Sequence, residues 1–147
     1  EKLVLTRRPD GHWGRPIEGT PSTHILKPEI DRFPKTVENE FFCMRLAHHL
    51  GLRVPEVAMI KIGERQLIVV ERYDRLVRTD GSVERIHQED FCQATGVPPE
   101  KKYEQDGGPS LRQIAEILAS ATAAGYLDEF LRAFTLSCLS DPGGGSS

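Results

Sequence analysis

The chain changes from strand-forming to helix-forming patterns at about residue 86, and this change constrains its fold more than any other feature. Before residue 86, short β-favouring runs alternate with turns that are rich in glycine and proline. Beyond it, apolar residues recur at helical spacing over 87–95, 110–121 and 126–139. Strands that are followed by helices predict an α+β fold.

Two hairpins are predicted in the strand-rich part. Residues 54–62 and 66–71 form apolar, β-rich runs separated by Gly63-Glu64-Arg65, a short loop suited to a hairpin, so we expect them to be antiparallel neighbours. A second turn at 79–82 is followed by a short run at 83–86 that can pair back. Two successive hairpins predict a small antiparallel sheet.

One helix is predicted within the strand-rich part, over residues 36–50. Thr36 suits the N-cap position, and Gly51 suits the position that follows the last turn. The apolar residues between them fall on two adjoining helix faces. Residues 2–7 predict a further strand, which lies ahead of a turn-rich stretch.

These patterns divide the chain into three parts. We expect a β-rich unit over 1–86, a helical part over 87–139 and a flexible tail over 140–147, whose glycines and serines are typical of linkers. Within the helical part, Ser110 and Gln113 match a capping box, which predicts a helix that begins there.

The composition is that of a globular protein and gives no indication of nucleic-acid binding or of a membrane span. The chain has 147 residues, a hydrophobic fraction of 38% and a formal net charge of −3, with its bases interspersed among acids. This balance gives no electrostatic footprint for nonspecific nucleic-acid binding, and no apolar run approaches the roughly 18 residues of a membrane span.

The three cysteines point to a reducing compartment. Cys43, Cys92 and Cys138 are odd in number, far apart and without metal-ligand spacing. We expect all three to be buried apolar residues, and we expect the protein to be cytoplasmic.

A lysine stands at the end of a predicted strand over 23–27, where Pro28 biases Lys27 toward an extended conformation. A helix that carries Glu38 and Glu40 follows about a dozen residues later. A strand lysine held by a helix glutamate is the arrangement by which kinases place an ammonium on nucleotide phosphates. The same residues also fit a solvated lysine and first-turn acids that the helix dipole favours.

Residues 67–75 form an apolar strand that runs into alternating charges and one aromatic residue, Tyr73. In a kinase-like fold this strand would lead into the hinge, where exposed backbone groups bond the adenine edge beside an aromatic ring. A sheet edge that is protected by charge explains the same residues.

Residues 103–110 contain two glycines and a proline and lead into a predicted helix. Helix N-termini bind anions readily, but Glu104 and Asp106 would repel phosphate. We therefore expect a loop with a defined conformation here and not a phosphate-binding loop. The sequence contains no GxxxxGK[ST] phosphate loop, no HExxH metal motif and no GxSxG hydrolase motif.

Six blocks lie in a fixed order between residues 23 and 109. They are THILKP (23–28), VENEFFC (37–43), LAHHLGLRVP (46–55), ERYDR (71–75), QEDFCQ (88–93) and KYEQDGGP (102–109). In this order the blocks resemble the HipA family of bacterial serine/threonine-protein kinase toxins. The resemblance implies a kinase-like small lobe with an antiparallel sheet and one αC-like helix, followed by the first helices of the large lobe.

The resemblance also implies roles for five residues. Lys27 corresponds to the lysine that binds the ATP phosphates, and Glu40 is the expected partner that orients it. Glu71 and Tyr73 correspond to the adenine-side hinge, and Asp74 is a candidate ribose contact. Glu1 and Lys2 look like the tail of the nucleotide-loop segment of the family.

The catalytic loop of the family has no counterpart in the sequence. In the family, the helix corresponding to residues 130–139 is followed by an Asp-x-His-x-x-Asn loop and then by a metal-binding aspartate. Residues 140–147 take that place, and Asp141 is not followed by histidine or asparagine at the family spacing. The resemblance therefore assigns no catalytic residue and no metal ligand to this chain.

The implied activity is ATP-dependent phosphorylation of a protein serine or threonine, with ATP and Mg²⁺ as cofactors. The substrates of the family are aminoacyl-tRNA synthetases, its partner is a HipB-like helix-turn-helix antitoxin, and its toxin–antitoxin activity is linked to bacterial persistence. The alternative is a noncatalytic nucleotide- or partner-binding module derived from the same fold.

Phosphoryl transfer requires metal ions that neutralise the developing charge and a base that orients the nucleophile. We therefore predict that the purified chain does not transfer phosphate from ATP to a serine substrate. Single-turnover assays with radiolabelled ATP measure this directly, and detectable transfer would contradict the prediction.

Overall fold

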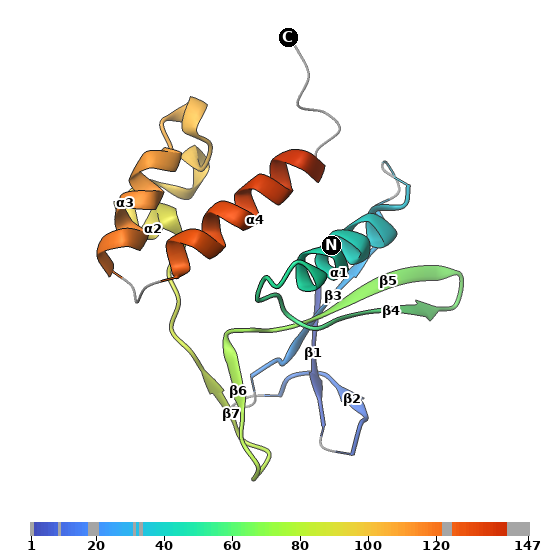
Figure 1. Ribbon diagram of the computed structural model, residues 1–147. Coiled ribbons are helices and arrows are strands. Elements are labelled where there is room, and N and C mark those ends of the chain that lie inside the picture. The colour runs from blue at the N-terminus through green and yellow to red at the C-terminus, as the bar shows by residue number, and fades with distance from the viewer. Residues whose placement is uncertain are drawn as a thin grey trace. The chain divides into compact units, whose positions relative to one another are not determined.

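The computed structural model describes residues 2–8, 10–17, 21–30, 32, 34–121 and 125–140. The chain divides into two compact units, Glu1–Ile86 and His87–Ser147, which are described one at a time (Figure 1). The tail predicted for residues 140–147 lies outside the described residues, apart from the backbone of Ser140.

Five strands of the first unit form one antiparallel sheet in the order β2-β1-β3-β5-β4 (Figure 1). The strands are β1 (Leu3–Arg7), β2 (Trp13–Gly14), β3 (His24–Pro28), β4 (Val57–Ile62) and β5 (Arg65–Glu71). The sequence patterns predicted every strand except β2, which is only two residues long and lies in the turn-rich stretch.

Glycines close both predicted hairpins. Between β4 and β5, Gly63 has a φ of 60° and begins a two-residue turn, so that Arg65 already lies in β5 opposite Ile62. The predicted three-residue loop is therefore one residue too long. Strands β6 (Arg75–Val77) and β7 (Val83–Arg85) form the second hairpin as a separate two-stranded sheet.

Helix α1 (Thr36–His49) packs against β4 and β5. The prediction that Thr36 is the N-cap is wrong by one residue, because Lys35 takes that position in the left-handed conformation with a φ of 64°. Lys35 is held there by its N–H, which donates to Glu29 Oε1 at 2.6 Å. The Thr36 hydroxyl instead accepts from the Ile30 N–H at 3.2 Å.

The end of α1 follows the sequence prediction. Gly51 has a φ of 79°, and its N–H donates to the carbonyl of His48. The N–H of Leu52 donates to the carbonyl of Ala47, which completes a Schellman motif. Leu52 and Ala47 are both buried, so the motif also brings an apolar residue back onto the helix.

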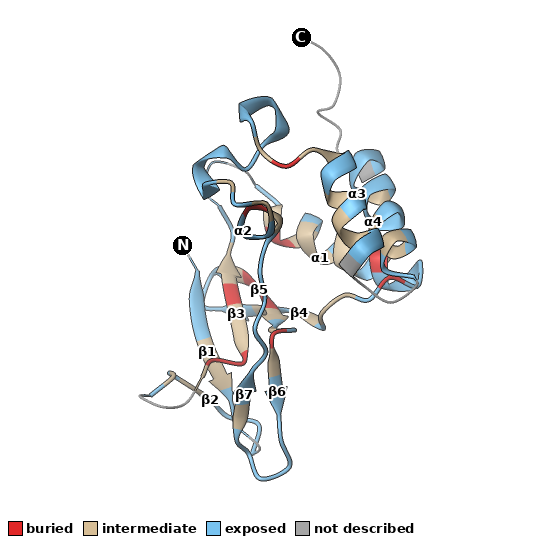
Figure 2. Ribbon diagram, turned by 90° about the vertical axis from the view of Figure 1, so that its left-hand side faces the viewer, coloured by how far each residue is buried: buried red, intermediate tan, exposed pale blue. Residues whose placement is uncertain are grey.

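The central strands β3 and β5 of the first unit carry buried residues (Figure 2), and their side chains lie on both faces of the sheet. On one face Leu26, Leu67 and Val69 form a buried cluster. Since successive residues of a strand point to opposite faces, the next pair along the ladder, Lys27 and Ile68, lies on the other face. Ile68 is fully buried there.

The second unit consists of short turns and three helices. The helices are α2 (Phe91–Thr95), α3 (Leu111–Ala121) and α4 (Tyr126–Ser140), and the loop after α2 contains the 3₁₀ turns η1 (Pro99–Lys101) and η2 (Glu104–Asp106). Helices α3 and α4 pack together. The ring of Phe130 lies 6.1 Å from that of Phe91 and 6.4 Å from that of Phe134.

Capping boxes set where α2 and α3 begin. The predicted box at Ser110 is confirmed, because the Gln113 side chain accepts from the Ser110 N–H and the Gln113 N–H donates to the Ser110 hydroxyl. The helix predicted over 87–95 is too long. It begins only at Phe91, because Asp90 and Gln93 form a second capping box there.

The cysteine prediction is only partly correct. Cys92 is buried, but Cys43 is half-buried and Cys138 is exposed on α4. All three thiols are free. The exposed position of Cys138 shows that cysteine type alone does not indicate the buried face of a helix.

Replacing Ile68 with alanine is expected to lower the free energy of unfolding by about 2 to 5 kcal/mol, because the side chain is 0% exposed and the site would keep a cavity. Ile62→Ala in the neighbouring strand is the matched control. Its side chain is 59% exposed, so the expected change is within about 0.5 kcal/mol. Urea unfolding followed by circular dichroism measures both, and equal losses would refute this account of the core.

Candidate functional site

Lys27 and Glu40 form an ion pair between the central strand β3 and helix α1. Lys27 Nζ donates to Glu40 Oε1 at 2.5 Å. The two side chains are 33% and 36% exposed, so water screens the pair and it adds little to stability. What it does is fix the direction of the ammonium group, and the amine keeps access to solvent and ligands.

A pocket of about 360 Å³ opens beside this pair. Its charged lining residues are Lys2, Lys27, Arg65, Glu29 and Glu40. Val37 and Ile68 supply apolar surface. Three cations against two carboxylates leave the pocket lining with a net positive charge, which favours an anionic ligand.

The predicted hinge residues lie at the end of β5. Because Lys27 pairs with Ile68, the side chain of Glu71, three residues further on, points to the opposite face of the sheet. It lines a second pocket of about 540 Å³ instead. The structure therefore does not place the Glu71 side chain beside Lys27, so a contact from Glu71 to the same ligand would have to come from its backbone.

Tyr73 is an exposed residue of the hinge segment. Its exposed fraction is 71%, whereas Asp74 beside it is 6% exposed. The backbone ahead of Tyr73 is held by two hydrogen bonds, from the Glu71 N–H to the Glu56 carbonyl and from the Arg72 N–H to the Thr23 carbonyl. The tyrosine ring is thus available to a ligand on a fixed strand end.

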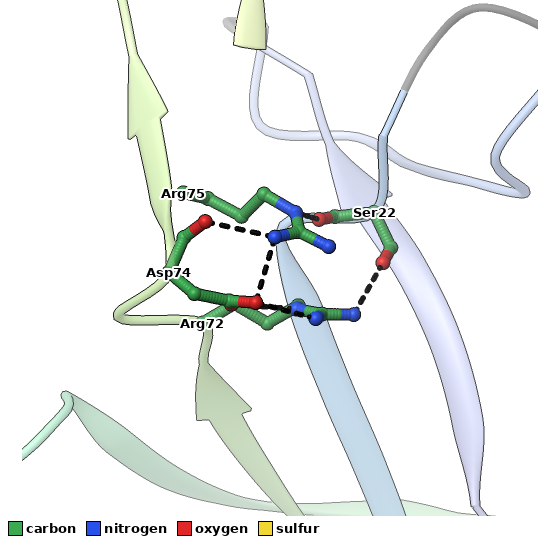
Figure 3. A network of polar contacts seen from close by, with 4 residues as sticks. All are labelled: Ser22, Arg72, Asp74 and Arg75. Atoms are coloured by element: carbon green, nitrogen blue, oxygen red, sulfur yellow. Dashed lines mark hydrogen bonds and ion pairs between the residues drawn. The ribbon is translucent and has the colours of Figure 1, made fainter. Parts of the chain in front are cut away.

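Asp74 is the centre of a polar network (Figure 3). Its Oδ1 accepts from Arg72 Nε at 2.9 Å, and its Oδ2 accepts from Arg72 Nη2 at 2.8 Å and from Arg75 Nη1 at 2.7 Å. Arg72 Nη1 also donates to the Ser22 hydroxyl at 3.2 Å. Both carboxylate oxygens are therefore occupied by guanidinium groups, and the ribose contact for Asp74 stays a prediction.

Charge explains why Asp74 is ionised in this buried position. The hydrogen bonds from Arg72, with the positive charges of Arg72 and Arg75, hold the pKa of Asp74 below its usual range, although burial acts in the opposite direction. The same partnership raises the pKa of Arg72. Sequence reasoning missed this network, and the alternating charges of 72–75 are the signal that could have indicated it.

The described part of the chain shows no metal centre and no membrane span. Within it, no group of three or more histidine, cysteine, aspartate or glutamate residues could hold a metal ion. None of its helices combines the length and apolar character that crossing a membrane requires.

An antiparallel sheet in which a strand lysine meets a helix glutamate is the arrangement found in the class of protein-kinase-like folds. Comparison with known proteins gives the family. The HipA-like C-terminal domain family matches residues 1–142. The chain therefore belongs to the HipA-like C-terminal domain family, and the predicted HipA resemblance and α+β kinase-like fold are confirmed.

Two curated relatives support this assignment. "Putative kinase Y4mE" of Sinorhizobium fredii is 54% identical over 114 residues, which cover 78% of this chain and 27% of that protein. The serine/threonine-protein kinase toxin HipA of Shewanella oneidensis is 42% identical over 102 residues, which cover 68% of this chain and 23% of that protein. The chain thus spans about a quarter of the length of these two relatives.

A solved structure shows the same fold. It is the complex of Shewanella oneidensis MR-1 toxin–antitoxin system HipA, HipB and its operator DNA. The matching chain has a TM-score of 0.64 and 36% sequence identity, and the match covers 79% of this chain and 26% of that chain.

Replacing Asp74 with asparagine is expected to lower the free energy of unfolding at pH 7 by about 3 kcal/mol, because Arg75, which is 8% exposed, and Arg72, which is 21% exposed, lose their carboxylate partner. The folded-state pKa of Asp74 lies below its unfolded value of about 3.9. The wild-type advantage should therefore be present above about pH 4 and shrink as the pH falls below it. Urea unfolding of both proteins at pH 7 and pH 2.5 checks this, and a gap that does not depend on pH would disprove it.

Proposed function

We propose that this chain forms the nucleotide-binding part of a HipA-family kinase, which uses ATP to phosphorylate a serine or threonine of a protein. The contact between Lys27 and Glu40 at the wall of a pocket is the observation that carries the proposal. Family membership supports it, as do relatives that are named as kinases.

The pocket beside Lys27 fits a triphosphate. Lys27 would donate to phosphate oxygens while Glu40 keeps the ammonium directed at them, and Lys2 and Arg65 would add positive charge around the same ligand. Bound ATP with Mg²⁺ supplies the phosphoryl group and the charge neutralisation of the reaction. No described residue is assigned to Mg²⁺, because no described acidic cluster fits a metal ion.

The base of the nucleotide would lie against the end of β5. There the Glu71 carbonyl can accept from adenine, the Tyr73 N–H can donate to it, and the exposed Tyr73 ring can flank it. Recognition through the backbone agrees with the Glu71 side chain pointing to the face of the sheet opposite Lys27. The contact of Asp74 with the ribose stays a sequence prediction. It would compete with the hydrogen bonds that Arg72 and Arg75 donate to the same carboxylate.

The partners belong to the whole protein. The matching solved structure contains HipA, HipB and operator DNA. By analogy, we propose a helix-turn-helix antitoxin as the partner of the whole protein, aminoacyl-tRNA synthetases as its substrate class and the cytoplasm as its location.

Lys27→Ala is expected to weaken binding of Mg²⁺–ATP by about tenfold or more, because a charge-assisted hydrogen bond to phosphate is lost. Binding of adenosine, which has no phosphate, should stay the same. Glu40→Gln should weaken ATP binding less, since the ammonium remains but is less well directed. Isothermal titration calorimetry measures all three.

Lys61→Ala is the matched control, because Lys61 is an exposed lysine of β4 outside the pocket. It should bind ATP like the wild type. Equal ATP affinity for wild type and Lys27→Ala would remove Lys27 from the site.

A further inference from the structure

We propose that the network of Ser22, Arg72, Asp74 and Arg75 determines recognition of the nucleotide base by fixing the backbone of Tyr73. In this proposal Asp74 is a positioning residue and not a ligand of the ribose. The proposal rests on the proposed function, because it concerns how the adenine edge is recognised at the end of β5.

The hydrogen bonds between the side chains of Arg72 and Asp74 close a ring that includes the backbone of Tyr73. Arg72 and Asp74 flank Tyr73 in the sequence, and their side chains join through two parallel hydrogen bonds of 2.9 and 2.8 Å. A bidentate arginine–carboxylate pair allows only a narrow range of geometries. The backbone torsions of Tyr73 are therefore restricted from both sides, and its N–H is held in one direction.

The same network joins the hinge to the segment that leads into β3. Arg75 Nε donates to the Ser22 carbonyl at 3.1 Å, and Arg72 Nη1 donates to the Ser22 hydroxyl at 3.2 Å. The Arg72 N–H donates to the Thr23 carbonyl at 2.8 Å. Thr23 directly precedes β3, the strand that carries Lys27. The group that would contact the base and the group that would contact the phosphates thus keep a fixed separation.

A further bond holds the hinge from the other side. The Ile86 N–H, just beyond β7, donates to the Asp74 carbonyl at 3.0 Å. Arg75 Nη1 donates to the same carbonyl at 2.8 Å. The backbone on the C-terminal side of Tyr73 is therefore as well anchored as the backbone on its N-terminal side.

The exposed fractions of the side chains indicate which residues position the hinge and which can contact a ligand. The side chains of Asp74 and Arg75 are 9% and 8% exposed, whereas Tyr73 is 71% exposed. A ribose hydroxyl would have to reach a carboxylate that is 9% exposed and already accepts three hydrogen bonds from guanidinium groups, which is unfavourable. Tyr73, which directly precedes Asp74, is left open to a ligand.

Three probes separate base, ribose and phosphate recognition. They are ATP, 2′,3′-dideoxy-ATP, which lacks both ribose hydroxyls, and inorganic tripolyphosphate, each titrated with Mg²⁺ into wild type and Asp74→Asn. Asp74→Asn should weaken ATP and 2′,3′-dideoxy-ATP by about tenfold each, which equals about 1.4 kcal/mol. Tripolyphosphate binding should change by less than about twofold, because its contacts lie at Lys27.

Glu84→Gln is the matched control. Glu84 pairs with Arg78 in the hairpin that follows the hinge, and both side chains are exposed. Removing this carboxylate should leave the affinities for all three probes unchanged. A base-dependent loss in this variant would overturn the assignment to the Asp74 network.

Each other result for Asp74→Asn also decides the question. A loss for ATP without a loss for 2′,3′-dideoxy-ATP would make Asp74 a ribose ligand. Equal losses for all three probes would make the network purely structural, and no loss would remove it from recognition. If the wild type binds ATP no more tightly than tripolyphosphate, the base is not recognised, and the inference fails while the phosphate pocket stands. If the wild type binds neither ATP nor tripolyphosphate, the proposed function fails.

Ser22→Ala provides the test if Asp74→Asn does not fold, as circular dichroism would show. It removes one hydrogen bond of Arg72 and leaves the arginine–carboxylate pair in place. We expect about a threefold loss for both nucleotides and none for tripolyphosphate. A loss that is absent, or the same for all three probes, would overturn the proposal.

Discussion

The antiparallel pairing of β3 with β5 sets Lys27 opposite Ile68 and Leu26 opposite Val69. This register buries Leu26 and Val69 on one face and leaves Lys27 on the face where Glu40 lies. A shift by one residue would move every side chain of the strand to the other face. It would place the ammonium in the apolar cluster and move the leucine out of that cluster, so the apolar core and the charged site stabilise the same register.

The two charged groups of the candidate site differ in how far water reaches them. The Lys27–Glu40 pair is about one third exposed, and an anion can share the ammonium with the carboxylate at little cost. In the Asp74 network the side chains of Asp74 and Arg75 are less than a tenth exposed and that of Arg72 is 21% exposed, so separating its charges would leave a largely buried carboxylate without partners. The first pair is therefore suited to contact a ligand, and the second is suited to hold the backbone that contacts one.

Local sequence signals predicted most of the fold. Gly51 and Gly63 marked the end of a helix and a hairpin turn because few other residues adopt positive φ. Ser110 and Gln113 marked a helix start because their side chains bond the free backbone groups there. The contact between Lys27 and Glu40 was expected from the resemblance to a kinase family, since the spacing of the two residues alone also fitted solvated side chains.

The features that were missed depend on partners far away in the sequence. Lys35 became the N-cap of α1 because Glu29 accepts its N–H, and no local preference for lysine indicates this. The arginines of the Asp74 network bond to Ser22, about fifty residues away, so the pattern of 72–75 showed the charges without their arrangement. The outward direction of the Glu71 side chain follows from strand register, which the sequence does not specify by itself.

The Schellman motif at the end of α1 also limits how that helix can move. Leu52 is buried and its N–H is bonded to the carbonyl of Ala47, one turn back in the helix. Leu52 therefore moves with the last turn of α1, and a shift of the helix along its axis would also change the packing that buries Leu52. Glu40 travels with the same helix, so leucine burial at one end resists withdrawal of the carboxylate near the other.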